Sequence, residues 1–342
     1  MATVAAPAPE EKQGRVEWLD LFRGAAVLAM METHVVNTFL APGLREAAWF
    51  GWLNWLNGLI APSFLFIAGY AQGMSWRATP AKAADFGRKS RRLLGVAALG
   101  YALHFPFTEL GQHRWTDALR VGTQVDVLQC LALALLGVLG VTALIRVLPE
   151  KWRGMAGLMG VAGLGIVAIA MAPDAAAWTG GPVPLAAFVN DRTGSLFPVF
   201  PWAAFVFCGA LTGASTLRQP SWMLVMAALV KCGAHLADDG TFSDLSPAFF
   251  CERLAWVLAL AALGQWVAQG WRPRGVMFAG RESLIMYAGH LIIIEGLVGL
   301  GAPRGGLSPT GVALIFAAVV ATTFVVALAK AKWTSRRVRK TA

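Results

Sequence analysis

An arginine and a histidine in the first apolar segment have a spacing that could support chemistry. The chain reads LDLFRG over residues 19–24 and ETH over residues 32–34. Eleven positions separate Arg23 from His34, which is about 1100° of helix rotation and within about 20° of whole turns. Both side chains therefore share one helix face, about 16 Å apart along the axis. This predicts Arg23 near the cytoplasmic surface and His34 in the outer half of a membrane core about 30 Å thick.

This pair has a catalytic and a structural interpretation. Arg23 could hold a phosphate while His34 acts as general base on a hydroxyl or amine that enters from outside. The pantetheine arm of coenzyme A is about as long as the separation between them. Alternatively, Arg23 pairs with Asp20 at the helix end, and His34 hydrogen-bonds a neighbouring helix.

A basic cluster follows the second apolar segment, with Arg88, Lys89, Arg91 and Arg92. It could clamp the phosphates of a cytoplasmic anion, or simply mark a cytoplasmic loop. The sequence has no phosphate-cradling glycine loop, no serine nucleophile elbow and no zinc motif, and its four cysteines lack metal-ligand spacing. We therefore expect no metal, and the pattern speaks against a nucleotide hydrolase or a metallopeptidase.

Further ionisable side chains fall in the middle or the outer half of apolar segments, where they are costly and often functional. Together they predict a polar acceptor pocket open to the outside. Its candidates are His290, Lys231, His235 and Glu295, with His104 at the outer end of a third segment. Lys231 shares a helix face with His235, and it has the alternative of pairing with Asp238 or Glu252.

The amino-acid composition indicates that these residues lie on membrane-spanning helices. Hydrophobic residues make up 57% of the 342 residues and charged residues 14%, with a mean hydropathy of +0.58. The apolar residues come in long runs, which excludes a water-soluble enzyme, a disordered chain and a disulfide scaffold. We expect an all-α, polytopic membrane helix bundle.

Ten segments are long enough, or nearly so, to cross a bilayer. They are Leu19–Leu40, Trp55–Trp76, Leu93–Phe107, Val121–Ile145, Gly154–Ala172, Phe197–Leu217, Trp222–Leu236, Phe249–Val267, Leu284–Leu300 and Gly311–Leu328. The second and sixth share prolines and glycines, which raises the possibility of a duplicated half.

The distribution of basic residues orients these spans. With a cytoplasmic N-terminus, 21 of the 29 Lys and Arg residues lie inside and 5 lie in outer loops, as the positive-inside rule requires. Both termini are then cytoplasmic. The net charge of +10 reflects topology, so we expect no nucleic-acid partner. We divide the chain into a flexible tail (1–17), a transmembrane domain (18–330) and a basic tail on anionic lipid (331–342).

Several motifs resemble known proteins. Arg23 with His34 resembles the Arg-x10-His signature of the transmembrane acyltransferases, and Arg88 with Arg91 resembles the basic pair of that superfamily. The segment 283–290 is similar to its Ser-x-x-x-Tyr-x-x-His motif. Segments 61–69, 125–129 and 197–202 most resemble the branch of heparan-α-glucosaminide N-acetyltransferase-like proteins.

This resemblance implies transfer of an acyl group, usually acetyl, from cytoplasmic acyl-CoA to a carbohydrate or similar acceptor across the membrane. It implies His34 as the catalytic residue, Arg23, Arg88, Arg91 and Arg92 at the coenzyme A end, and His290 in the pocket. The animal branch carries its histidine in the loop after the first span, and the corresponding loop 41–54 has none. The His34 assignment therefore follows the bacterial pattern, with a bacterial inner membrane as the expected location. The acceptor, the acyl length and the oligomeric state stay open, and so does the choice between a covalent acyl-histidine and direct transfer.

Two other classes of protein fit the same features. A multi-span transporter or lipid flippase also needs buried polar residues, and it would show helices broken at the midplane and inverted repeats. A non-catalytic partner in a glycan-modification complex would keep the fold without depending on His34.

Overall fold

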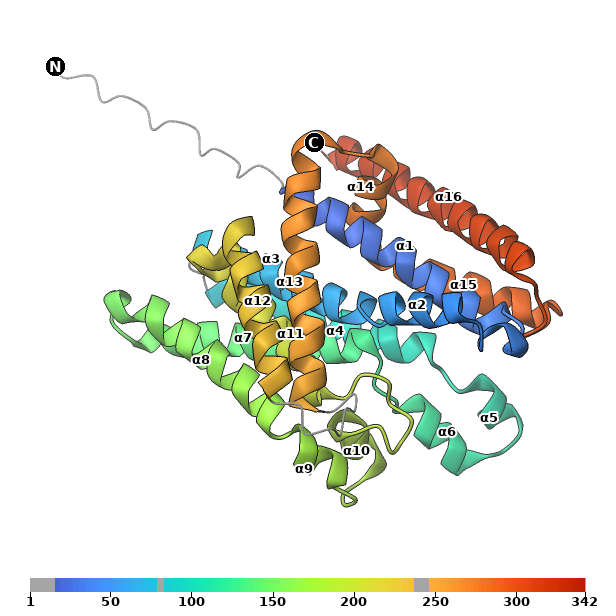
Figure 1. The fold of residues 1–342 in the computed structure, drawn as a ribbon, viewed down its shortest axis with the longest axis horizontal. Coiled ribbons are helices and arrows are strands. Elements are labelled where there is room, and N and C mark those ends of the chain that lie inside the picture. Colours follow the sequence, from blue (N-terminus) through green and yellow to red (C-terminus); the bar gives the residue numbers. More distant parts are fainter. Residues whose placement is uncertain (1–15, 79–82, 237–245, 342) are drawn as a thin grey trace.

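A computed structural model describes residues 16–78, 83–236 and 246–341, and the part described is all-α, as predicted (Figure 1). Within these residues there is no β-strand, and a single isolated bridge joins Leu40 to Leu307. The helices are α1 (Glu17–Phe39), α2 (Ala48–Asn57), α3 (Ile60–Ala78), α4 (Ala83–Leu103), α5 (Phe107–Gly111), α6 (Trp115–Gly122), α7 (Val127–Leu144), α8 (Glu150–Ala170), α9 (Ala172–Ala177), α10 (Val183–Val189), α11 (Val199–Ala214), α12 (Pro220–Leu236), α13 (Pro247–Gly270), α14 (Arg274–Arg281), α15 (Ser283–Gly299) and α16 (Pro309–Thr341).

Each of the ten predicted segments lies on at least one of these helices. Five helical stretches of the described chain are long and apolar enough to cross a membrane, and α14 with α15, bent by 88°, would form a sixth. The chain is therefore an integral membrane protein. Four predicted segments fall outside this set. The first and third lie on α1 and α4, which carry the charged residues discussed above, and the sixth and seventh lie on α11 and α12, which are apolar but have only 16 and 17 residues. The number of crossings, ten, stays a prediction.

Some predicted boundaries were wrong. The segment Val121–Ile145 is two helices, because α6 ends at Gly122 and Asp126 caps a new helix, α7. The last helix contains the predicted span Gly311–Leu328 and continues beyond it to Thr341, since no helix-breaking residue intervenes. Most of the predicted flexible tail, residues 1–15, lies outside the described residues.

Helices α3 and α11 form the centre of the bundle and run in the same direction. An added Cβ on Gly69 would come within 2.0 Å of the Val206 carbonyl oxygen, and one on Gly209 within 2.0 Å of the Phe66 oxygen. One turn further on, Gly73 approaches the Ala210 carbonyl and Gly213 approaches the Tyr70 carbonyl in the same way. Small residues four apart let the two backbones touch. The glycines of each helix therefore contact the backbone of the other in the same way, and the duplicated half stays a hypothesis.

The first helix lies between this centre and the C-terminal helices (Figure 1). Its start packs tightly on α14, where Gly280 approaches the Asp20 backbone and Gly24 approaches Val276. Its end is tied to the loop before α16, because Ala41 donates to the Leu307 carbonyl and Gly305 donates to the Thr38 carbonyl. Helix α1 therefore runs parallel to α15.

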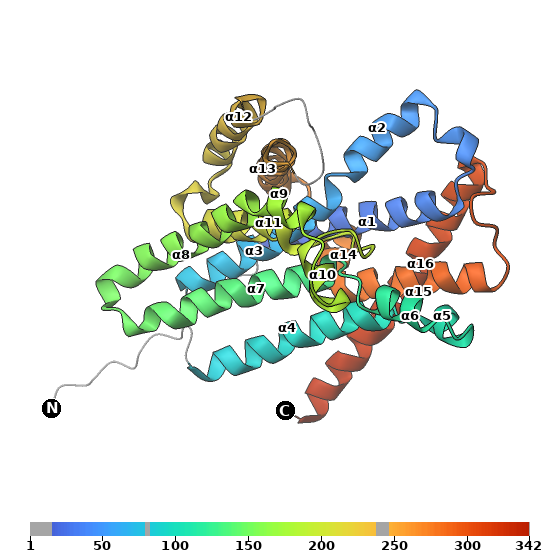
Figure 2. The same cartoon turned by 90° about the horizontal axis from the view of Figure 1, so that it is seen from below.

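Helices α4, α7 and α8 lie side by side, and α5 and α6 sit together at one end of them (Figure 2). Helices α4 and α7 form an antiparallel hairpin, and α12 packs mainly on α13. This arrangement brings the C-terminal end of α4, the N-terminal end of α7 and the middle of α15 to the same level of the bundle.

Candidate active site

A cavity of about 420 Å³ opens between α1, α3, α4, α7 and the start of α15. Its size is in the range of small-molecule sites, about 300–1,000 Å³. Three cations line it, and so do three neutral polar side chains: Arg23, Lys89, Arg92, Gln72, Ser75 and Ser283. Its remaining lining is apolar. Such a cavity suits a ligand that is anionic at one end and apolar along its length.

The basic cluster after α3 contributes only in part to this cavity. Lys89 and Arg92 line it, three residues apart on α4. Arg88 and Arg91 are exposed and are not among its lining residues. The structure therefore groups Arg23 with Lys89 and Arg92, and it places the predicted pair Arg88 and Arg91 elsewhere on α4.

His34 lies against His290. Their ring centroids are 5.2 Å apart, so the two imidazoles from α1 and α15 are in contact. Arg23 and His34 both face α15, as their helical spacing predicted. The His290 side chain is fully buried, whereas His34 is only partly buried.

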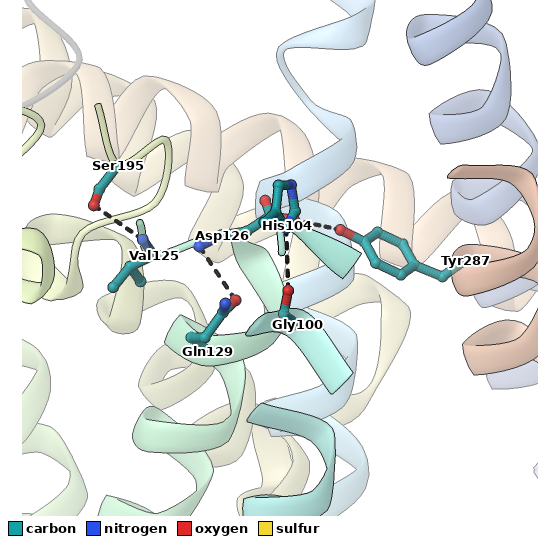
Figure 3. A network of polar contacts seen from close by, with 7 residues as sticks. All are labelled: Gly100, His104, Val125, Asp126, Gln129, Ser195 and Tyr287. Atoms are coloured by element: carbon teal, nitrogen blue, oxygen red, sulfur yellow. Dashed lines mark hydrogen bonds and ion pairs between the residues drawn. The ribbon is translucent and has the colours of Figure 1, made fainter. Parts of the chain in front are cut away.

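A buried carboxylate completes a polar cluster beside these histidines. Asp126 accepts a hydrogen bond of 2.6 Å from the Tyr287 hydroxyl, and His104 Nε2 lies 3.7 Å from the same carboxylate oxygen (Figure 3). Tyr287 also touches His290, with ring centroids 5.6 Å apart. The cluster therefore joins four helix segments that are distant in the sequence.

Local sequence explains why Asp126 stands there. It is the N-cap of α7 in a capping box, in which its own backbone N–H donates to Gln129 Oε1 at 3.2 Å. The preceding residue, Val125, donates its N–H to Ser195 Oγ at 3.0 Å (Figure 3). The turn between α6 and α7 is thus stabilised by one hydrogen bond within α7 and one to the segment before α11.

Phe64 connects the cavity with the polar cluster. It lines the cavity from α3 and stacks on Tyr287, with ring centroids 6.5 Å apart. Leu128, which is two residues from Asp126, lines the same part. The cations therefore line the cavity, while the histidines and the carboxylate lie outside its lining, on the other side of Phe64.

Three of the predicted acceptor-pocket residues lie elsewhere. Lys231 forms an ion pair with Glu252 between α12 and α13, which is one of the two partners considered above, while Asp238 lies outside the described residues. His235 is exposed in the last turn of α12. Glu295 is exposed and accepts two hydrogen bonds, of 3.0 and 2.8 Å, from Arg304. Of the four candidates, only His290 joins His34.

Asp126 and Tyr287 lie in the polar cluster, and sequence analysis did not single them out as candidate site residues. Both belong to motifs quoted above only for their resemblance. The Asp-x-x-Gln pattern at 126–129 is a helix N-terminus signal, and a carboxylate at that position inside an apolar segment could have drawn attention. Among the described residues, no three His, Cys, Asp or Glu side chains are grouped so as to hold a metal ion.

Comparison with known proteins adds one match. The family described as "Heparan-alpha-glucosaminide N-acetyltransferase, catalytic" matches residues 15–236. That range includes α1, the cavity cations and Asp126, and it ends before α15. No curated protein matches the chain.

Proposed function

Because the chain belongs to the heparan-alpha-glucosaminide N-acetyltransferase catalytic family, we propose that it is a membrane acetyltransferase. It takes the acetyl group of acetyl-CoA on the cytoplasmic side of a bacterial inner membrane. It passes this group to a hydroxyl or amine of a carbohydrate or related acceptor on the far side. The observation that carries the proposal is the two-ended site, with cations along the cavity and two histidines beyond Phe64.

The donor binds with its charged end at the cations. Arg23, Lys89 and Arg92 hold the phosphates of coenzyme A, where a guanidinium can bond two oxygens at once. Ser283 at the start of α15 adds the N–H groups of a helix end to the same wall. The apolar lining receives the pantetheine arm and directs the thioester toward the histidines.

His34 acts as the general base in the transfer step. It takes the proton of the acceptor hydroxyl or amine while the oxygen or nitrogen attacks the thioester carbonyl carbon. The carbon–sulfur bond then breaks, and the sulfur leaves with the proton from His34 as free coenzyme A. A neutral acceptor and acetyl-CoA thus give the acetylated product and coenzyme A with no net proton released.

The test follows labelled acetyl from acetyl-CoA supplied only at the cytoplasmic face of membrane vesicles. We expect label in an outer glycan or lipid fraction, and we expect His34→Ala to lower the rate about 10²–10⁴-fold. His113→Ala is the matched control, since His113 is an exposed histidine in the α5–α6 turn. Coenzyme A binding should survive in both variants.

Two results would count against this function. Transfer by His34→Ala within a few-fold of the unsubstituted protein would remove His34 from the reaction. An intact protein that neither transfers label nor binds coenzyme A would favour the transporter or flippase alternative, and uptake assays would follow.

A further inference from the structure

One nitrogen of His290 is buried without a partner. His290 Nδ1 lies 2.9 Å from the Met286 carbonyl oxygen, one turn back on α15. A carbonyl only accepts, so Nδ1 carries the hydrogen and donates it. In the neutral ring the lone pair is then on Nε2. That atom is buried and has no hydrogen-bond partner among the described residues. An unpaired buried acceptor costs about 1–3 kcal/mol, so a donor is to be expected beside it.

His34 is the nearest ring that can supply this donor. The two centroids are 5.2 Å apart with the planes at 48°, which leaves no room for another side chain between them. His34 is only partly buried, so its ring is the freer of the two to turn an N–H group toward His290 Nε2. His290 has no such freedom, because it is fully buried and bonded to Met286.

We propose that His290 accepts a hydrogen bond from His34 and thereby determines which nitrogen of His34 carries the proton. The inference rests on the proposed function, because it assigns His290 as the positioning residue of the base. With one His34 nitrogen held as a donor to His290, the other keeps its lone pair for the acceptor nucleophile. When His34 takes up the substrate proton, its bond to His290 becomes charge-assisted and therefore stronger.

The surrounding contacts fix His290 in place. Tyr287, one turn before it, packs edge-on against its ring and donates to Asp126. Asp126 is in turn fixed by the capping box at the start of α7. The hydrogen bond between Tyr287 and Asp126 thus ties α15 to α7 and sets the rotation of α15 that presents His290 to His34.

Two substitutions at one position separate a hydrogen-bond role from a packing role. Glutamine keeps an acceptor oxygen, whereas leucine fills similar space with no acceptor. We expect His290→Leu to lower kcat on the order of 10²-fold, while the KM for acetyl-CoA changes less than about threefold. His290→Gln should recover about a tenth or more of the unsubstituted rate. Thermal unfolding and acetyl-CoA binding check that both variants fold.

A spectroscopic readout does not depend on activity. Nitrogen-15 chemical shifts of labelled histidines, assigned through the single substitutions, report which ring nitrogen is protonated. We expect one His34 tautomer in the unsubstituted protein and in His290→Gln, and a mixture or the opposite tautomer in His290→Leu.

Three results would overturn the inference. They are an unchanged His34 tautomer in His290→Leu, a kcat of that variant within about threefold of the unsubstituted value, and equal loss in the glutamine and leucine variants. Failure of the proposed function looks different, because the unsubstituted protein would then transfer no acetyl group while the tautomer measurement still reports on the two rings.

Discussion

At the residue scale, the basic residues of the cluster after α3 are neighbours in the sequence but lie in different surroundings. Arg91 and Arg92 are adjacent, yet only Arg92 lines the cavity. Successive residues on a helix point about 100° apart, so at most part of such a cluster can face one site. Lys231 gives a second case, because it forms an ion pair with the Glu252 carboxylate on α13 and not with a residue of the cavity.

A pair of neighbouring substitutions tests this division. Arg92→Ala should raise the KM for acetyl-CoA about tenfold, equivalent to about 1.4 kcal/mol, because one phosphate contact is lost. Arg91→Ala removes the same charge from the same helix turn and should leave this KM within about twofold. Steady-state kinetics at fixed salt would measure both. Equal effects of the two variants would mean that only the general positive potential matters.

At the element scale, close backbone contacts hold the helices that position the site. Helix α3 supplies Phe64 to the cavity, and it is seated on α11 through glycines on both helices. Helix α1 is seated on α14 in the same way, through Gly24 and Gly280. In a membrane, where apolar side chains gain little by leaving lipid, such contacts are a main source of association between helices.

A matched pair of glycine substitutions tests the α3–α11 contact. The added methyl of Gly69→Ala would lie 2.0 Å from the Val206 oxygen, so the helices must separate, at a cost of about 1–3 kcal/mol. Gly95→Ala on α4 meets open space, and it should be neutral or stabilise the helix by up to about 1 kcal/mol. Thermal unfolding in detergent compares the two. Equal unfolding temperatures would contradict the close packing described here.

At the scale of the whole molecule, the contacts between helices show the relative directions of several of them. Helices α3 and α11 are parallel and α1 and α15 are parallel, while the C-terminal end of α4 meets the N-terminal end of α7 near His290. The prediction of ten crossings requires these same relative directions, and it also predicts the cations toward one side of the membrane and the histidines toward the other.

Reporter fusions test this topology. Fusions between α5 and α6, between α10 and α11, and between α15 and α16 should report the outside. Fusions between α7 and α8 and after α16 should report the cytoplasm, because the basic residues are concentrated in those segments. Alkaline phosphatase and green fluorescent protein give opposite signals on the two sides. A C-terminus on the outside would require an odd number of crossings.

The sequence alone determined the class of protein, most of its helices and the helix face that Arg23 shares with His34. Long apolar runs can be satisfied only by helices in a membrane, so the all-α bundle follows from composition. The face shared by Arg23 and His34 follows from the helical period, which is a local property. Asp126 as a helix cap is equally local, since the capping box lies within residues 126–129.

Only the tertiary structure decided which polar residues meet. Nothing in the spacing of His34, Asp126, Tyr287 and His290 along the chain shows that they form one cluster. Their meeting depends on which helices are neighbours and on how each is rotated, and both are set by the packing of α1, α7 and α15 against the other helices. The same packing places Lys231, His235 and Glu295 elsewhere, although their positions in apolar segments resemble that of His290.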